Sequence, residues 1–122
     1  MSDDAPLTTL KIRLVFGEAG MFGPGKADLL DGIAETGSIS AAGRRLGMSY
    51  KRAWQLVETM NTCFADPLVL STRGGAQGGG AVLTDTGREV LATYRKIAGD
   101  AARTAGTDIE RLERLLAKRQ RD

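Results

Sequence analysis

The sequence predicts a mainly α-helical fold with one small β-hairpin and a long C-terminal helix. After Pro24, apolar residues recur at helical spacing over most of the chain. Two short apolar runs flank a glycine-rich segment, 73–80, as the strands of a hairpin would. The 122 residues, 42% of them apolar, are enough for one domain with one core.

The N-terminal part is predicted to hold one strand. Residues 1–9 are polar and acidic and are expected to be flexible. From Leu10 to Phe16 every second residue is apolar, which is the pattern of a half-buried strand. The following stretch, Gly17 to Gly25, is rich in turn residues and is predicted to be a link.

Two helices are predicted next. Pro24 suits the first turn of a helix, and Gly37 is a typical residue at a helix end. Ser38 fits the N-cap of a short second helix, about residues 39–46, because its hydroxyl can accept a hydrogen bond from an unpaired amide. Gly47 then ends this helix with a sharp turn.

A third helix is predicted from Ser49, its N-cap, to about Asn61. A short helix, a glycine turn and a longer helix in this order are typical of the helix-turn-helix motif. Tyr50 and Trp54 lie one turn apart, and both are expected to pack in the core rather than stack on bases. The hydroxyl of Tyr50 could nevertheless reach a phosphate.

The hairpin is predicted to follow Pro67, which blocks helix formation. Residues 68–72 and 81–83 form its expected strands, with the glycine-rich segment between them. Three helices followed by a two-stranded hairpin are the elements of a winged helix-turn-helix, in which the hairpin, about residues 68–83, is the wing.

Two further helices are predicted after the hairpin. Thr84 is expected to cap a long helix that Gly106 interrupts, and Thr107 to cap a last one. The sequence is therefore divided into a winged helix-turn-helix domain at residues 10–104 and a C-terminal helix at residues 105–122.

The N-terminal end of the third helix is the expected contact with DNA, because a recognition helix enters the major groove by that end. Arginine there can bind guanine, and glutamine can bind adenine. The candidate DNA-contacting residues are Ser38, Arg44, Ser49, Tyr50, Lys51, Arg52, Gln55, Arg73, Gly74 and Gln77.

The distribution of charge supports this interpretation, although the net charge is only +2. Between Thr36 and Val57 there are four basic residues and no acidic one. Basic residues on helices are usually a solvated surface, but such a surface is expected to contain interspersed acids. The segregation favours a basic face that meets phosphates.

The glycine-rich segment is interpreted as the tip of the wing. A phosphate-binding loop of the nucleotide-binding type requires Lys-Ser or Lys-Thr and then a helix, whereas Gly80 leads into a strand. Arg73 and Gln77 would reach the sugar-phosphate backbone. The alternative is a loop that does not contact DNA.

Composition argues against an enzyme. The chain has no histidine, the commonest general base and metal ligand, and its single cysteine, Cys63, has no basic neighbour within one turn. No catalytic residue, cofactor or metal site is predicted. No apolar run is long enough for a membrane span, and the acidic N-terminus is unlike a signal peptide. A cytoplasmic location is expected.

Several motifs carry a resemblance to a known family. They are the stretch Gly37 to Ser40, the string Met48 to Lys51 with Ala53 and Trp54, and Gly74 and Gly75 with the stretch Gly78 to Thr84. The stretch from about Leu10 to Tyr94 resembles the N-terminal DNA-binding domain of the ModE-type molybdate-responsive regulators, which are related to the LysR helix-turn-helix domain.

The resemblance implies a dimer on a palindromic operator, held by the long C-terminal helix and the N-terminal strand. It implies DNA contacts for Ser49, Lys51, Arg52 and Arg73. Members of the family carry C-terminal molybdate-binding modules, whereas this chain ends at Asp122. We therefore expect no response to molybdate, or to another oxyanion, by that route.

The last helix independently favours a homodimer, because its apolar stripe needs a partner surface. The expected dimerisation residues are Leu91, Tyr94, Ile97, Ile109, Leu112 and Leu116. The sequence thus predicts a dimeric, sequence-specific transcriptional regulator that represses by occluding a promoter. The alternative is a winged helix that binds protein or RNA, or an accessory subunit that acts only with a longer partner regulator.

Overall fold

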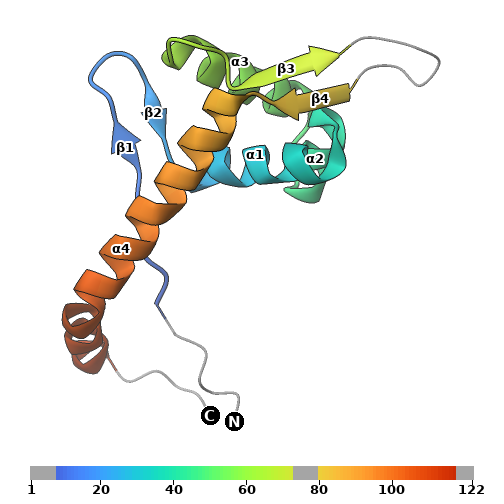
Figure 1. Ribbon diagram of the computed structural model, residues 1–122. Coiled ribbons are helices and arrows are strands. Elements are labelled where there is room, and N and C mark those ends of the chain that lie inside the picture. The colour runs from blue at the N-terminus through green and yellow to red at the C-terminus, as the bar shows by residue number, and fades with distance from the viewer. Residues whose placement is uncertain (1–7, 73–79, 118–122) are drawn as a thin grey trace.

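The computed structural model describes residues 8–72 and 80–117. The elements in chain order are β1 (Leu14–Val15), β2 (Met21–Phe22), α1 (Pro24–Thr36), α2 (Ile39–Arg45), α3 (Tyr50–Cys63), β3 (Val69–Thr72), β4 (Gly80–Leu83) and α4 (Asp85–Leu115). In Figure 1, α1 and α2 lie below the β3–β4 hairpin, α3 passes behind it, and α4 runs away from them past β1 and β2. The predicted mainly helical fold with a small hairpin and a long C-terminal helix is confirmed.

Local sequence signals set the ends of the helices, as predicted. Gly37 ends α1 with φ of 71°, a left-handed conformation that glycine adopts without strain. The hydroxyl of Ser38 accepts a hydrogen bond from the amide of Ala41 at 3.0 Å, and that of Ser49 accepts from the amide of Arg52 at 3.0 Å. Each side chain satisfies a donor that the first turn of its helix leaves unpaired.

Small residues allow the three central helices to approach closely. A Cβ atom built at Gly32 of α1 would lie 2.9 Å from the Cβ of Ala42 in α2. One built at Gly43 of α2 would lie 2.8 Å from the Cβ of Ala53 in α3. Glycine at both positions therefore fixes how α2 sits between α1 and α3.

One core lies below the β3–β4 hairpin. Its largest fully buried side chains come from β2, α1, α3 and the residue just before β3, and they are Phe22, Leu29, Leu30, Ile33, Met60 and Leu68. Strands β3 and β4 are antiparallel, with Val69 opposite Leu83. The amide of Ala81 in β4 also donates to the carbonyl of Gly37 at 2.9 Å, which fastens the hairpin to the connection between α1 and α2.

The predicted N-terminal strand is only partly correct. Of the stretch from Leu10 to Phe16, only Leu14 and Val15 form a strand, and its partner is Met21–Phe22 inside the predicted link. The amide of Phe16 donates to the carbonyl of Gly20 at 2.8 Å and closes a tight turn between the two strands. Gly17 and Gly20 of the predicted link belong to this turn, whereas Gly23 is the N-cap of α1 and Gly25 lies in its first turn.

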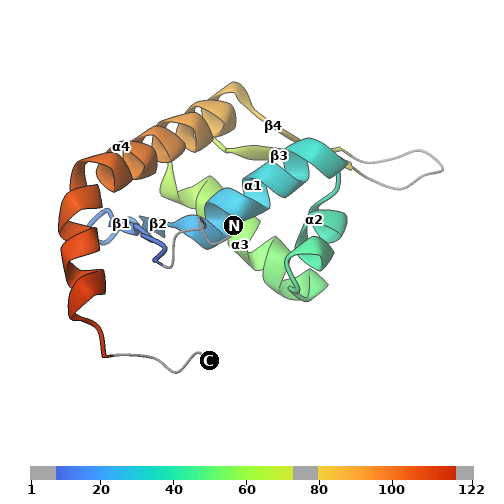
Figure 2. The same cartoon turned by 90° about the horizontal axis from the view of Figure 1, so that it is seen from below.

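The predicted break in the C-terminal helix is wrong. Helix α4 continues through Gly106, and Thr107 lies inside it rather than at an N-cap. A glycine inside a helix costs only about 1 kcal/mol relative to alanine. In a long amphipathic helix, the packing of its apolar face offsets this cost. Figure 2 shows that the continuous helix nevertheless bends, so that its C-terminal part leaves the axis of its first part.

Candidate nucleic-acid interface

Helix α3 presents one polar face outward. Its inward residues include Ala53, Val57 and Met60, all of which are buried. On the opposite side, the spacing i, i+4, i+7 and i+11 places four exposed residues in one stripe. These residues are Lys51, Gln55, Glu58 and Thr62. Arg52 and Thr59 flank the stripe, and Arg52, Gln55 and Glu58 help to line one shallow surface hollow.

The first turn of α3 concentrates the positive charge. Lys51 and Arg52 are exposed there, directly after the Ser49 cap. This end of the helix also carries the positive pole of the helix dipole. Side-chain charge and dipole therefore act together on an anion such as a phosphate at this end.

Tyr50 departs from the sequence-based expectation. It does not pack in the core, because 64% of its surface is exposed. Its ring instead meets that of Trp54 edge to face, with 6.1 Å between the ring centroids. Trp54 is half-buried and packs against the core as expected. Tyr50 thus joins the exposed N-terminal end of α3.

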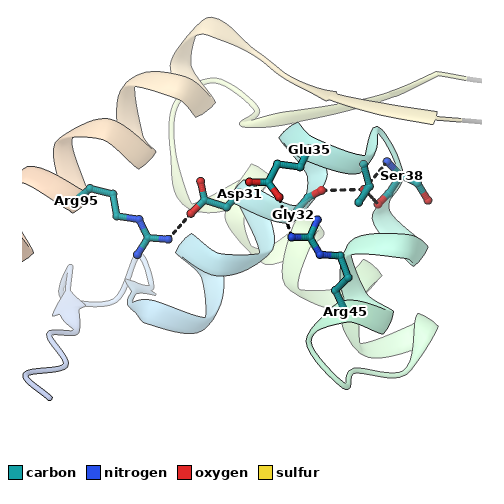
Figure 3. A network of polar contacts seen from close by, with 7 residues as sticks. Asp31, Gly32, Glu35, Ser38, Arg45 and Arg95 are labelled. Carbon is teal, nitrogen blue, oxygen red and sulfur yellow. Dashed lines mark hydrogen bonds and ion pairs between the residues drawn. The ribbon is translucent and has the colours of Figure 1, made fainter. Parts of the chain in front are cut away.

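Helix α2 carries two exposed arginines, of which one forms an ion pair. Arg45 pairs with Glu35 of α1 at 2.7 Å, so its charge is partly neutralised (Figure 3). Arg44 is exposed, and within residues 8–72 and 80–117 it forms no ion pair. Ser38, at the start of the same helix, is half-buried and its hydroxyl caps the helix. Arg44 is therefore the arginine of α2 whose charge no acid of the described residues neutralises.

Helix α4 is tied to α1 by Arg95. Its guanidinium pairs with Asp31, and with Asp28 at 3.1 Å; Figure 3 shows the first of these contacts. The hydrogen bond to Asp31 is the main cause of a raised pKa for Arg95. Because α1 also packs against α2, this contact links α4 mechanically to the helix-turn-helix motif.

Lys26 supplies a buried positive charge in α1. Its ammonium donates to the carbonyl of Met21 at 2.8 Å. Burial disfavours the charged form and lowers the pKa of Lys26, and the positive charge of Arg52 lowers it further, while Cys63 acts in the opposite direction. Lys26 holds β2 against α1 and is not exposed for an external anion.

Asn61 joins α3 to the β3–β4 hairpin, a contact that the sequence did not indicate. Its side-chain oxygen accepts from the amides of Leu68 at 2.8 Å and Val69 at 3.1 Å. Its side-chain nitrogen donates to the carbonyl of Val69 at 3.0 Å. One side chain of α3 therefore fixes the start of β3. The wing residues Arg73, Gly74 and Gln77 lie outside the described residues.

Glu58 is the second residue that sequence reasoning missed. The acid-free stretch runs from Thr36 to Val57, so an acid stands immediately beyond each of its ends, at Glu35 and Glu58. The signal was present in the spacing, since Glu58 follows Gln55 by three residues on a helix. The structure places Glu35 against Arg45 and Glu58 on the outward face of α3.

The expected dimerisation residues fall into two groups. Leu91 and Tyr94 pack within the chain: Tyr94 is buried, and its hydroxyl donates to the carbonyl of Ile12 at 2.6 Å. Tyr94 is thus mainly a core residue of the chain. Ile97 and Leu112 are exposed, as is Leu116, whereas Ile109 is half-buried.

An apolar groove of about 370 Å³ lies beside the first half of α4. Its apolar walls come from the β1–β2 hairpin, the end of α3 and α4, and they are Leu14, Phe16, Phe22, Phe64, Val90, Tyr94 and Ile97. Glu89 and two threonines supply its polar groups.

Two other classes of site are absent from the described part of the chain. Residues 8–72 and 80–117 contain no group of three or more His, Cys, Asp or Glu side chains that could hold a metal ion. None of the helices in these ranges is long and apolar enough to cross a membrane.

Comparison with known proteins identifies relatives of this segment. The model of the lysR family of bacterial regulatory helix-turn-helix proteins matches residues 26–88. The molybdenum-pterin-binding protein MopB of Rhodobacter capsulatus is 47% identical over 81 residues, which are 66% of this chain and 30% of that protein. The DNA-binding transcriptional dual regulator ModE of Escherichia coli K12 is 41% identical over 75 residues, or 62% and 29% of the two chains.

The ModE resemblance expected from the sequence is thereby confirmed for this region. The chain spans less than a third of the length of these relatives. Among solved structures, the crystal structure of a CbnR_DBD–DNA complex has a TM-score of 0.56 at 20% identity, covering 72% of this chain and 95% of that one. This likeness shows that the two chains share a fold.

Proposed function

Because this chain belongs to the lysR family of bacterial regulatory helix-turn-helix proteins, we propose that it binds double-stranded DNA sequence-specifically through α3. Proteins of this family are DNA-binding regulators and not enzymes. The observation that carries the proposal is the exposed first turn of α3, where Lys51 and Arg52 lie beside the Ser49 cap with no acidic neighbour in that turn.

The proposed contacts follow from the positions of these side chains. Arg52 and Gln55 would bind base edges in the major groove. Ser49, Tyr50 and Lys51 would bind phosphates, as would Arg44 from the end of α2. Phosphate contacts would fix the position of the helix, and base contacts would supply the specificity. The wing residues Arg73, Gly74 and Gln77 remain predicted backbone contacts.

Replacing Arg52 by alanine tests this proposal. We expect Arg52→Ala to weaken binding to the preferred DNA by about 1–3 kcal/mol and to relax selectivity at one base pair. Fluorescence anisotropy with DNA from the chain's own upstream region, against a scrambled duplex at several salt concentrations, measures both effects. Arg103→Ala, which removes a cation in the second half of α4, is the matched control. Equal loss in both variants would contradict a base contact by Arg52.

We also propose that two copies associate through α4. Leu112, Leu115 and Leu116 are 65%, 78% and 63% exposed, and exposed leucines in such a cluster mark interaction surfaces. The groove beside the first half of α4 is apolar but lies about 22 Å along the helix from Leu112, counted from Ile97 at 1.5 Å per residue. The leucines of one copy therefore cannot fill its own groove.

An antiparallel pair of α4 helices would allow the leucines of one copy to reach the groove of the other. A two-fold axis near the middle of the helix would bring the leucines of each copy to the groove of the other, which buries both apolar surfaces. Residues 10–104 would then form the DNA-binding domain, and the end of α4 the dimerisation element. Ile97 and Ile109 would lie opposite each other across this axis.

Charge at the leucines tests the dimer. We expect Leu112→Glu/Leu115→Glu to sediment as a monomer at concentrations where the wild type has the mass of a dimer, because four carboxylates would enter an apolar contact. Thr59→Glu/Thr62→Glu, which adds the same charge at the same spacing on the exposed face of α3 and away from α4, is the control. A wild-type protein that is monomeric at all concentrations would contradict the dimer.

We propose repression as the mode of regulation, since a DNA-binding domain acts most simply by covering a promoter. We expect deletion of the gene to raise transcription from the bound promoter, measured by run-on synthesis; lower transcription would indicate activation instead. Addition of molybdate is expected to leave operator binding by this chain unchanged, because the proposed DNA contacts on α2 and α3 require no bound molybdate.

A second candidate function is a partner-dependent winged helix that binds protein rather than DNA on its own. Leu70 and Val82, which are opposite each other in the β3–β4 register, are both half exposed and form an apolar pair on the outer face of the hairpin. Absence of DNA binding by the wild type, together with a protein contact that Leu70→Ser abolishes, would favour this function.

A further inference from the structure

We propose that Glu58 is a specificity-determining residue, which accepts a hydrogen bond from a cytosine in the major groove and disfavours other bases at that position. This proposal rests on the proposed function of α3 and goes beyond it, because it assigns an acidic residue to a surface that is otherwise basic.

The position of Glu58 places it in the same stripe as the proposed DNA contacts. It lies seven residues after Lys51 and three after Gln55, and the side chains of all three are exposed. Along the helix axis Glu58 is about 4.5 Å beyond Gln55, at 1.5 Å per residue. This distance is about one base-pair step of about 3.4 Å, so Glu58 would face a base pair next to that of Gln55.

The surroundings of Glu58 leave its carboxylate directed to solvent. Lys51 lies too far along the helix for an i, i+4 pair with it. Within residues 8–72 and 80–117, no lysine or arginine lies within ion-pairing distance of Glu58. Glu35, the acid at the other end of the basic segment, differs in this respect, since it pairs with Arg45.

A carboxylate at this position has a definite chemical preference. It is an acceptor only, and the N4 amino group of cytosine is the donor that acidic side chains bind in the major groove. Guanine and thymine would present acceptor oxygens to it and give no hydrogen bond. Adenine carries an amino donor beside its N7 acceptor, and that acceptor repels a carboxylate. Close to phosphates it also repels non-specific DNA, so that it lowers affinity for wrong sequences more than for the right one.

Selection of binding sites from a random duplex library, with wild type and Glu58→Gln, tests this proposal. We expect the wild type to select cytosine at one position next to the one that Gln55→Ala relaxes. We expect Glu58→Gln to lose that selection about ten-fold, because the amide offers a donor as well as an acceptor, and to bind random duplex several-fold more tightly. Glu18→Gln, in the turn between β1 and β2, makes the same change of charge away from α3 and is the control.

The outcomes separate the two proposals. If the wild type selects no sequence, the proposed function of α3 fails. If the wild type selects a sequence and Glu58→Gln selects the same one with the same discrimination, only the role of Glu58 is overturned. Tighter binding of Glu58→Gln to every duplex by one common factor would likewise overturn it, since the carboxylate would then only repel phosphates.

Discussion

Gly87→Ala is expected to lower the free energy of unfolding by about 3–4 kcal/mol, at the upper end of what a single added methyl group costs. A Cβ atom at Gly87 would lie 2.2 Å from the carbonyl oxygen of Leu68 and 3.0 Å from its carbonyl carbon. Both atoms belong to the main chain, so no side-chain rotation relieves the contact. The start of α4 must move away from β3, and the change is measured by urea denaturation followed by circular dichroism.

The same helix supplies the control for Gly87→Ala. Gly106 also lies inside α4, but a Cβ atom there would meet nothing within 4 Å. Gly106→Ala is therefore expected to stabilise the chain by about 0.5–1 kcal/mol, the difference in helix propensity between the two residues. A destabilisation of similar size in both variants would show that close approach to Leu68 is not the reason for glycine at position 87.

Asn61→Ala is expected to cost about 2–3 kcal/mol, because it leaves the amides of Leu68 and Val69 and the carbonyl of Val69 without their partner. Leu68 and Val69 are both buried, so water reaches these amides poorly. Thermal unfolding of the variant measures the loss.

Asn61→Asp separates the two halves of this contact. The carboxylate keeps both acceptor bonds to the amides but faces the carbonyl of Val69 without a donor. We expect Asn61→Asp to lie between the wild type and Asn61→Ala in stability. Hydrogen exchange at the Val69 amide should accelerate strongly in Asn61→Ala alone. If the two variants are equally unstable, the acceptor bonds contribute little and the bond to the Val69 carbonyl is the important one.

Much of the fold is predictable because its signals are local. The caps at Ser38, Ser49 and Thr84 and the left-handed Gly37 depend on residues within one turn, and all four were predicted from the sequence. The exposed face of α3 follows from helical periodicity in the same way. These features need no knowledge of distant parts of the chain.

The features that the sequence did not reveal depend on contacts between distant residues. Strand β2 exists because it pairs with β1. Tyr94 is buried because its ring packs against Phe22 of β2, and its hydroxyl reaches Ile12, 82 positions away. In the sequence, Asn61 is only a polar residue near a helix end. Its role becomes visible when the position of β3 against α3 is known. Helix α4 continues through Gly106 because helix formation is cooperative, so the turns on either side compensate for the low helix propensity of one glycine.

The bond between Arg95 and the carboxylates of α1 has a consequence for the spacing of two DNA half-sites. If α4 pairs with its copy, its angle to α1 also sets the angle between the two recognition helices. One inserted base pair rotates a half-site by about 34° around the duplex and moves it by about 3.4 Å, from a repeat of 10–10.5 base pairs per turn. If Arg95 holds α4 at a fixed angle to α1, the two recognition helices cannot turn to match this rotation. The spacing of the two half-sites around the duplex would then define the operator as much as its bases do.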